Sequence, residues 1–345
     1  MSHHFCFLLL PGFSMMGLMS AIEPLRVANR FHAPHYRWRL LSENGEAVPA
    51  SNGMSLNVDG ALADDLAGNS LFVVAGFDPL AGFSPQLANR LRRAEHECQV
   101  LGAIDTGSFV LAEAGLLDAK QRFTLHWEAL EAFRERYPQL LPTQELFEID
   151  GRRITSAGGT SSLDLMLGLI GRDHGEALSI QVSEQFVLGR IRTRLDHQRM
   201  QVSSRYGIHD KKLALVIGEM ERCTEEPRTP GQLADSVGIT TRQLERLFRQ
   251  HLNSTPVTFY LALRLDKGRQ LLRQSDLSVL EVALACGFDS ASYFARRYRT
   301  RFAVSPRQDR REAAPVSGWR RAPSSPTGAV DFSSPAQATC RRPCG

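Results

Sequence analysis

Arginine side chains at helical spacing are the residues of this sequence best suited to a chemical task. Ser292, Arg296 and Arg299 share one face of a helix predicted within residues 280–306, and aromatic residues recur every four positions on the opposite face. Small polar residues allow close approach to a nucleic acid, and guanidinium groups bind guanine edges or phosphates. This stretch predicts either a DNA-reading helix or an ordinary basic helical hairpin.

A second unit of the same kind precedes it. Gly238 predicts a tight turn and Thr240 a helix cap before a helix whose outer face carries more arginines. A helix predicted over Val257–Leu272 separates the two units, and about 16 residues of helix span roughly 24 Å. That length suits two readers in successive major grooves, about 34 Å apart. The side chains predicted to contact DNA are Arg242, Glu245 and Arg246 in the first unit and Ala291, Ser292 and Arg296 in the second.

Local signals predict how the second reading helix is held. Gly287 supplies the positive φ that a sharp helix–helix turn requires. Either Asp289 or Ser290 is expected to cap the following helix.

The net charge of +4 is unevenly distributed along the chain. Residues 1–210 contain 19 lysines and arginines against 24 aspartates and glutamates, whereas residues 211–312 contain 18 against 12. The basic excess therefore lies in the half that carries both helical units, as expected if only that half meets nucleic acid.

Composition excludes several classes of protein. The six cysteines are scattered and form no zinc-ligand spacing with histidines, so we expect no metal, no cofactor and no disulfide framework. The apolar run Phe5–Leu10 is too short to span a membrane and lacks the flanks of a signal peptide. A cytoplasmic, reduced protein without membrane contact is expected.

The first half of the chain alternates strands and helices, which predicts a mostly parallel sheet covered by helices on both faces. A helix over Met15–Phe31 is expected to be interrupted or kinked at Pro24, and another helix is predicted over Glu176–Arg194. Ligands bind such sheets at the carboxyl ends of strands. The predicted strands are Phe5–Leu10, Tyr36–Leu41, Leu71–Ala75 and Val100–Ile104, with a hairpin around Asp150-Gly151.

Four segments follow from these patterns. Residues 1–196 form the α/β domain, and residues 197–212 are a polar linker. Residues 213–312 form an all-α domain with two helix–turn–helix units. Residues 313–345 are rich in Pro, Ser, Ala, Gly and Arg, which predicts a disordered tail.

Residues 232–311 resemble the AraC/XylS family of transcriptional regulators. The resemblance is carried by LADSVGITTRQLERLFRQHLNSTPVTFYLALRLDKGRQLL and VLEVALACGFDSASYFARRYRTRFAVSPRQDRR. It implies binding to a double-stranded promoter operator, and activation through contact with RNA polymerase. Two positions depart from the family pattern: Ala303 stands where Gly is usual, which predicts a strained turn, and Asp309 where an aromatic residue is usual.

Residues 5–170 are similar to the DJ-1/PfpI, or class I glutamine amidotransferase-like, fold. The matching pieces are FLLLPGFSMMGLMSAIEPLRVAN, LGAIDTGSFVLAEAGLLDAKQRFTLHW and ITSAGGTSSLDLMLGLIGR. The resemblance implies a flavodoxin-like α/β domain and a homodimer. Regulators that join this domain to an AraC-type reader include sensors of arginine, glycine betaine or carnitine.

Enzymes with this fold carry a nucleophilic Cys at a strand-to-helix elbow. Here the elbow reads AIDTG and the nucleophile position matches Asp105. A carboxylate is a poor substitute for a thiolate, and Cys6 and Cys98 lie elsewhere on their strands. His126 without a nucleophile makes no catalytic pair, so we predict that the domain is not an enzyme.

Binding is the alternative use of this elbow. Two carboxylates, Glu23 and Asp105, are expected to share a pocket that favours a cation, and aromatic faces of Phe77 and Trp127 suit an ammonium group. Other interpretations stay open: Asp105 as a simple helix cap, His126 as a structural hydrogen-bonding residue and Trp127 as core. The predicted effector-binding residues are Glu23, Phe77, Asp105, Thr106, His126 and Trp127.

The sequence therefore predicts a regulator of a catabolic pathway that binds DNA and responds to a small cationic or zwitterionic effector such as an amine, betaine or amino acid. A hydrolase or glyoxalase-like enzyme carrying a DNA-binding module is the alternative. A third hypothesis is an interaction module that uses DNA only for localisation.

Overall fold

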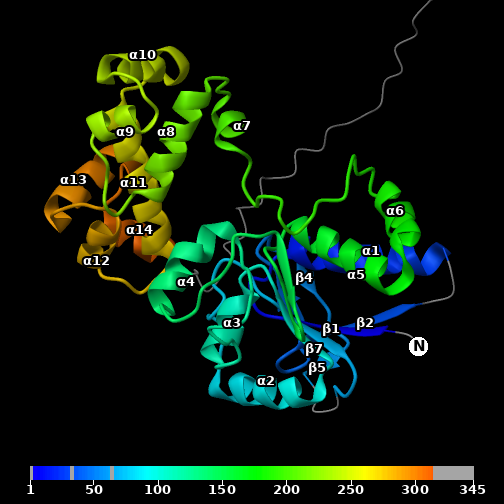
Figure 1. Cartoon of the computed structure of the whole chain (residues 1–345). Helices are drawn as coiled ribbons and strands as arrows, with labels where there is room; N and C mark the ends of the chain where they lie inside the picture. Colours follow the sequence, from blue (N-terminus) through cyan, green and yellow to red (C-terminus); the bar gives the residue numbers. More distant parts are fainter. Residues whose placement is uncertain (1–2, 32–34, 63–65, 314–345) are drawn as a thin grey trace, which may run out of the picture. The chain divides into compact units, whose positions relative to one another are not determined.

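Seven strands form one sheet in the first half of the chain, in the order β5-β2-β1-β6-β7-β9-β8 (Figure 1). The computed structural model describes residues 3–31, 35–62 and 66–313. All pairings in the sheet are parallel except β8 with β9. The strands are β1 (His3–Leu9), β2 (Tyr36–Ser42), β5 (Gly60–Ala61), β6 (Ser70–Val74), β7 (Val100–Ile104), β8 (Phe147–Asp150) and β9 (Arg153–Ser156), and β3 (Val48–Pro49) pairs with β4 (Ser55–Leu56) in a separate ribbon.

Helices cover both faces of this sheet, as predicted (Figure 1). One face packs against α1 (Met15–Phe31), α5 (Ser161–His174) and α6 (Glu176–Glu184) through a single apolar cluster. The other face packs against α2 (Pro85–Glu97) and α3 (Gly107–Glu113). Central strands buried on both sides explain the continuous apolar runs of the sequence.

Two helix predictions in this half are wrong in extent. The predicted interruption at Pro24 is wrong: α1 runs over 17 residues, and its buried face packs in the apolar cluster on this side of the sheet. The helix predicted over Glu176–Arg194 stops at Glu184. Val187 adopts a positive φ of 55° just beyond this end, which an α-helix cannot accommodate.

The second half is all-helical, as predicted. Part of the segment expected to be a linker, residues 197–212, folds into α7. The described helices here are α7 (Val202–Tyr206), α8 (Lys211–Arg222), α9 (Pro230–Ser236), α10 (Thr241–Leu252), α11 (Pro256–Gln274), α12 (Val279–Ala285), α13 (Ala291–Phe302) and α14 (Pro306–Ala313), while η1 (Trp127–Ala129) and α4 (Leu130–Arg136) precede β8.

The two helix–turn–helix units pack in different apolar clusters, and the cluster of the second unit also includes residues of α3 and α4. α8, α9 and α10 enclose a cluster that includes Met220, Leu244 and Phe248. The second unit, α12 and α13, is packed on α11 around Phe294 and Tyr298. The two reading helices therefore both pack on α11, α10 around Tyr260 and α13 around Gly268.

The second reading helix, α13, ends in a residue with a strained backbone conformation. Ala303 caps α13 with a φ of 61°, in the left-handed region where a Cβ costs about 1 kcal/mol. The predicted strain at this departure from the family pattern is therefore present.

Within residues 3–31, 35–62 and 66–313, the helices lack the length and apolar composition that a membrane span requires. The predicted disorder of residues 313–345 concerns a segment that lies almost entirely outside the described residues.

Candidate functional site

The first reading helix, α10, begins with a reciprocal cap. The Thr240 side chain accepts from the backbone of Gln243, and the Gln243 side chain accepts from the backbone of Thr240. Its apolar face is buried, which leaves the opposite face open to solvent. The predicted reading residues of this unit, Arg242, Glu245 and Arg246, are all exposed on that face.

The second reading helix, α13, is capped by Ser290, which decides between the two predicted caps. Phe294 and Tyr298 are buried on one side of the helix. Ser292 and Arg296 are exposed on the other side, whereas Ala291 is half-buried. Two of the three predicted reading residues of α13 are thus exposed, and Ala291 presents only part of its surface.

Sequence reasoning overlooked Tyr293. Its ring is 43% exposed, and the Arg296 guanidinium lies 5.3 Å from the ring centroid. A guanidinium stacked on an aromatic face keeps its edge free for hydrogen bonds. The signal was present in the sequence, because residues three positions apart are neighbours on a helix.

The arginines of the two reading faces are free of internal ion pairs. In the part of the chain that the structure describes, Arg242, Arg246 and Arg296 have no carboxylate oxygen within 4.0 Å. Arg301, on the same helix as Arg296, instead pairs with Asp266 at 2.7 Å. Unpaired guanidinium groups on exposed faces are available for phosphates or guanine edges.

The spacing between the readers is set by α11. This helix has 19 residues, three more than predicted, and therefore extends roughly 28 Å. That length approaches the distance of about 34 Å between successive major grooves on one face of DNA.

The second candidate site is the elbow between β7 and α3. Asp105 stands there with a φ of 63°, in a left-handed conformation that non-glycine residues seldom adopt. The Asp105 N–H donates to the Ser156 carbonyl at 3.0 Å, and the Thr106 hydroxyl donates to the Gly76 carbonyl. Strain of this kind persists where the surroundings impose it, and it is frequent at binding sites.

The Asp105 carboxylate lies among loops from the carboxyl edge of the sheet. Gly158 approaches so closely that a Cβ there would stand 2.4 Å from Asp105 Oδ2. Burial raises the pKa of Asp105 to about 7, although hydrogen bonds with the Ser14 side chain and the Thr106 backbone act in the opposite direction. Glu128 raises the same pKa further by charge repulsion.

Glu23, which was predicted to share a pocket with Asp105, forms an ion pair with Arg26, one helical turn away on α1, at 2.7 Å. The acidic side chain whose charge raises the pKa of Asp105 is Glu128, which sequence reasoning did not single out.

Two predicted effector-binding residues stand at the start of η1, His126 as its N-cap and Trp127 as its first residue. His126 accepts a hydrogen bond on Nδ1 from the Glu128 N–H at 3.4 Å, and burial lowers the pKa of its imidazole. Trp127 is half-buried, and the Arg199 guanidinium lies 4.4 Å from its ring centroid. His126 therefore holds the loop, while Trp127 presents an aromatic face that already receives a cation.

Comparison with known proteins identifies the family to which the chain belongs. A family model described as a helix-turn-helix domain matches residues 233–312. The HTH-type transcriptional regulator CdhR of Pseudomonas aeruginosa is 66% identical over 310 residues, which cover 90% of this chain and 92% of CdhR. The chain belongs to the AraC family of HTH-type transcriptional regulators. It is thus a ligand-responsive regulator that binds double-stranded DNA.

Two solved structures are also similar to it. An AraC family transcriptional regulator from Pseudomonas putida is 31% identical over 53% of this chain and 99% of its own, with a TM-score of 0.48. A ThiJ/PfpI family protein from Pseudomonas syringae is 19% identical over 64% of this chain and 87% of its own, with a TM-score of 0.48.

Two thiols of the first half of this AraC family member, Cys6 and Cys98, are poorly placed for nucleophilic chemistry. Cys6 is buried in β1 and Cys98 at the end of α2, and burial raises the pKa of both, to about 12 for Cys98. A thiol with such a pKa holds its proton near neutral pH. Among the described residues, no group of three His, Cys, Asp or Glu side chains is arranged to hold a metal ion.

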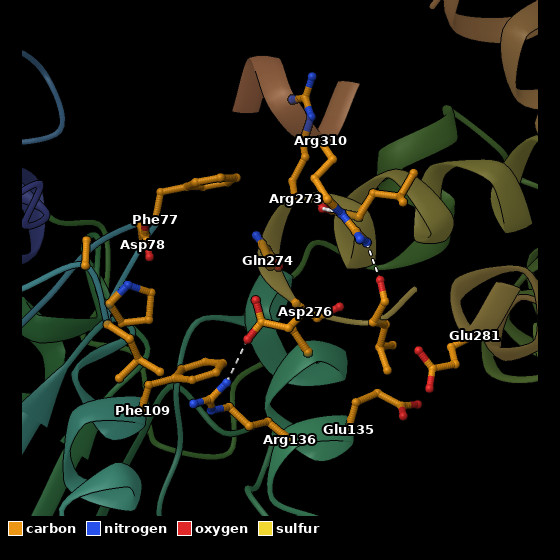
Figure 2. A pocket seen from close by; sticks show the side chains of 17 residues that line it. Phe77, Asp78, Phe109, Glu135, Arg136, Arg273, Gln274, Asp276, Glu281 and Arg310 are labelled. Carbon is orange, nitrogen blue, oxygen red and sulfur yellow. Dashed lines mark hydrogen bonds and ion pairs between the residues drawn. The ribbon is translucent and has the colours of Figure 1, made fainter. Parts of the chain in front are cut away.

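A cavity of about 610 Å³ lies beside the elbow but does not include it. Figure 2 shows Phe77 and Phe109 on one side of this cavity, and Arg273 and Arg310 on another. Arg136 closes part of it with a hydrogen bond of 3.0 Å to Asp276. Phe77, which is 46% exposed, therefore faces this cavity, whereas Asp105, Thr106, His126 and Trp127 do not line it.

Proposed function

We propose that this regulator binds a promoter operator with α10 and α13 in two successive major grooves. The observation that carries the proposal is the pair of exposed reading faces whose arginines have no carboxylate oxygen within 4.0 Å among residues 3–31, 35–62 and 66–313. Arg242, Glu245 and Arg246 serve as the contacts of α10, and Ala291, Ser292 and Arg296 as those of α13. Tyr293 joins them by orienting Arg296.

The decisive experiment measures operator affinity of the full chain by fluorescence anisotropy, on DNA selected by the protein from a random library. Arg242→Ala and Arg296→Ala should each weaken binding by about 1–3 kcal/mol and relax sequence preference at one position. Arg301→Ala is the matched control, because this arginine of α13 is already paired with Asp266. Equal affinity of all three variants and the parent protein would refute the assignment of the reading faces.

The effector part of the proposal rests on the elbow. A small cationic or zwitterionic molecule, such as an amine, betaine or amino acid, binds near Asp105, Thr106, His126 and Trp127. A carboxylate with a pKa near 7 and an aromatic face are the two groups that recognise such a molecule. Asp105→Ala should keep the affinity for bare operator and remove the response to effector.

The same elbow argues for binding rather than catalysis. Asp105 occupies the position where a thiolate would have to stand, and the described thiols of this half are buried. We therefore propose that the domain has no hydrolase or glyoxalase activity. Turnover of methylglyoxal or an amide by the full chain, lost in Asp105→Ala, would contradict this.

Regulation follows from linkage between the two sites. An effector that changes operator affinity must itself bind with different affinity when DNA is bound. We propose that a homodimer activates genes of a catabolic pathway through RNA polymerase. A transcription assay with purified polymerase, with and without the selected operator upstream, tests the sign of the effect.

A further inference from the structure

The face of the Trp127 ring is covered by a cationic side chain of the same protein, Arg199. The Arg199 guanidinium carbon is 4.4 Å from the ring centroid, within the distance at which a cation is attracted to an indole face. Trp127 packs against an apolar cluster. A resident guanidinium therefore covers an aromatic face that a cationic effector would use.

Arg199 contacts the aromatic ring but forms no ion pair with a described carboxylate, although the charge of Glu221 favours its charged form. In residues 3–31, 35–62 and 66–313, no carboxylate oxygen lies within 4.0 Å of the Arg199 guanidinium. The neighbouring arginines of the same segment differ, since Arg192 pairs with Asp164 and Arg194 with Glu148. Arg199 is thus the arginine of this segment that another cation could replace without breaking an ion pair.

The residue before Arg199 anchors the segment to the sensor domain. The Gln198 side-chain amide donates to Thr124 Oγ1 at 3.0 Å and to the carbonyl oxygens of Leu125 and Glu145 at 3.1 and 2.8 Å. His197 forms an isolated antiparallel bridge with Glu145. These contacts reach the stretch that continues directly into Trp127.

The residues after Arg199 connect to the first reading unit. Arg205 donates to the Met200 carbonyl at 2.9 Å and makes a bidentate pair with Glu221 of α8 at 2.8 and 2.6 Å. α8 in turn shares the buried cluster of α10. A short run of residues therefore joins the Trp127 face to a helix that supports DNA reading.

We propose that Arg199 is a tethered competitor for the cation site on Trp127, and that a quaternary ammonium effector displaces it and frees residues 197–200 from the sensor domain. The proposal rests on the effector site of the proposed function. A tethered cation occupies the face at high effective concentration, so it lowers the apparent affinity for a free cation. Its displacement couples effector binding to the connection with α8.

The test uses the full chain carrying Trp38→Phe and Trp319→Phe, so that Trp127 is the only indole. The probe is tetramethylammonium chloride, titrated against sodium chloride at equal ionic strength. Arg199→Met should bind the probe about two- to fivefold more tightly than the parent, which is the worth of an exposed cation–π contact. It should also make Trp127 more accessible to acrylamide quenching.

The control is Arg172→Met, which removes the same charge from an exposed arginine of α5 that pairs with its neighbour Asp173. This variant should match the parent in both measurements. In the parent, tetramethylammonium should also speed amide hydrogen exchange in residues 197–205, whereas sodium should not.

Two results would overturn the inference: no tetramethylammonium binding to Trp127 in either protein, or equal probe affinity and quenching in parent, Arg199→Met and Arg172→Met. Operator binding by the same proteins reports the proposed function separately. If the parent protein does not bind the operator, the proposed function is refuted, but the measurements on Trp127 still test the role of Arg199.

Discussion

Asp309 gives the sharpest test of how the second reading unit is held. Its carboxylate is 1% exposed and accepts hydrogen bonds from Tyr298 at 2.6 Å, Arg269 at 2.8 Å and Arg273 at 2.6 Å. These contacts join α14 to α13 and α11. Asp309→Asn keeps the shape of the side chain but removes the charge on which the two guanidinium groups depend.

The expected loss follows from the exposure of the partners. Breaking a buried ion pair by changing one member costs about 3–5 kcal/mol, because a buried charge is left without its partner. Arg269 and Arg273 are 36% and 33% exposed, so water recovers part of that loss. We expect Asp309→Asn to lower the free energy of unfolding of the second unit by about 2–3 kcal/mol.

Amide hydrogen exchange of α11 and α13 in the full chain measures this local stability. The matched control is Asp266→Asn, which removes another carboxylate paired to an arginine, at 2.7 Å, but 47% exposed. Exposed pairs contribute less than about 1 kcal/mol. Equal losses of local stability in the two variants would show that burial of the Asp309 cluster adds nothing to the strength of its ion pairs.

The same residue predicts a pH dependence. Burial by itself would raise the pKa of Asp309, but hydrogen bonds from Tyr298, Arg273 and Arg269 outweigh it and hold the pKa below its ordinary value. A depressed carboxyl pKa stabilises the fold above the unfolded pKa of about 3.9, and this stabilisation is lost as pH falls through the folded pKa. The difference between parent and Asp309→Asn should therefore shrink as the pH falls below about 4.

Two further predictions concern the turns and the elbow. Gly287→Ala should destabilise the second unit by more than about 2 kcal/mol and weaken operator binding, because its φ is 70° and the new Cβ would meet a backbone carbonyl oxygen at 2.6 Å. Gly238→Ala is the control: its φ is 64° but no atom lies within 4 Å of the new Cβ, so the cost should be only about 1 kcal/mol. Equal losses of stability in urea unfolding would contradict the role of the contact at Gly287. The pKa of Asp105 is raised to about 7, so the folded state keeps this proton at a pH where the unfolded state has released it, and stability falls as the pH rises from about 4 to 7. Asp105→Asn should remove that part of the dependence in thermal unfolding, and an unchanged profile would show that Asp105 is ionised throughout.

Much of the architecture was predictable from the chain alone. Apolar runs with turn residues between them predicted the four main parallel strands and the β8–β9 hairpin, because periodicity and turn chemistry are local properties. The turn at Gly287 was predictable for the same reason, whereas the helix cap was narrowed only to Asp289 or Ser290, of which the structure shows Ser290. The helix predicted over Glu176–Arg194 was wrong in length, since local composition did not reveal the positive φ at Val187.

Local sequence likewise determined the two reading faces and the elbow residue Asp105, which depend on spacing along one helix or one turn. What each side chain meets across the fold was decided by tertiary structure. Glu23 forms an ion pair with Arg26, and Arg199, which belongs to the expected linker, contacts the ring of Trp127. Asp309 appeared in the sequence only as a departure from the family pattern, yet packing makes it the centre of a buried charge cluster. Such contacts join residues far apart in the chain, and their geometry exists only once the helices and the sheet are packed.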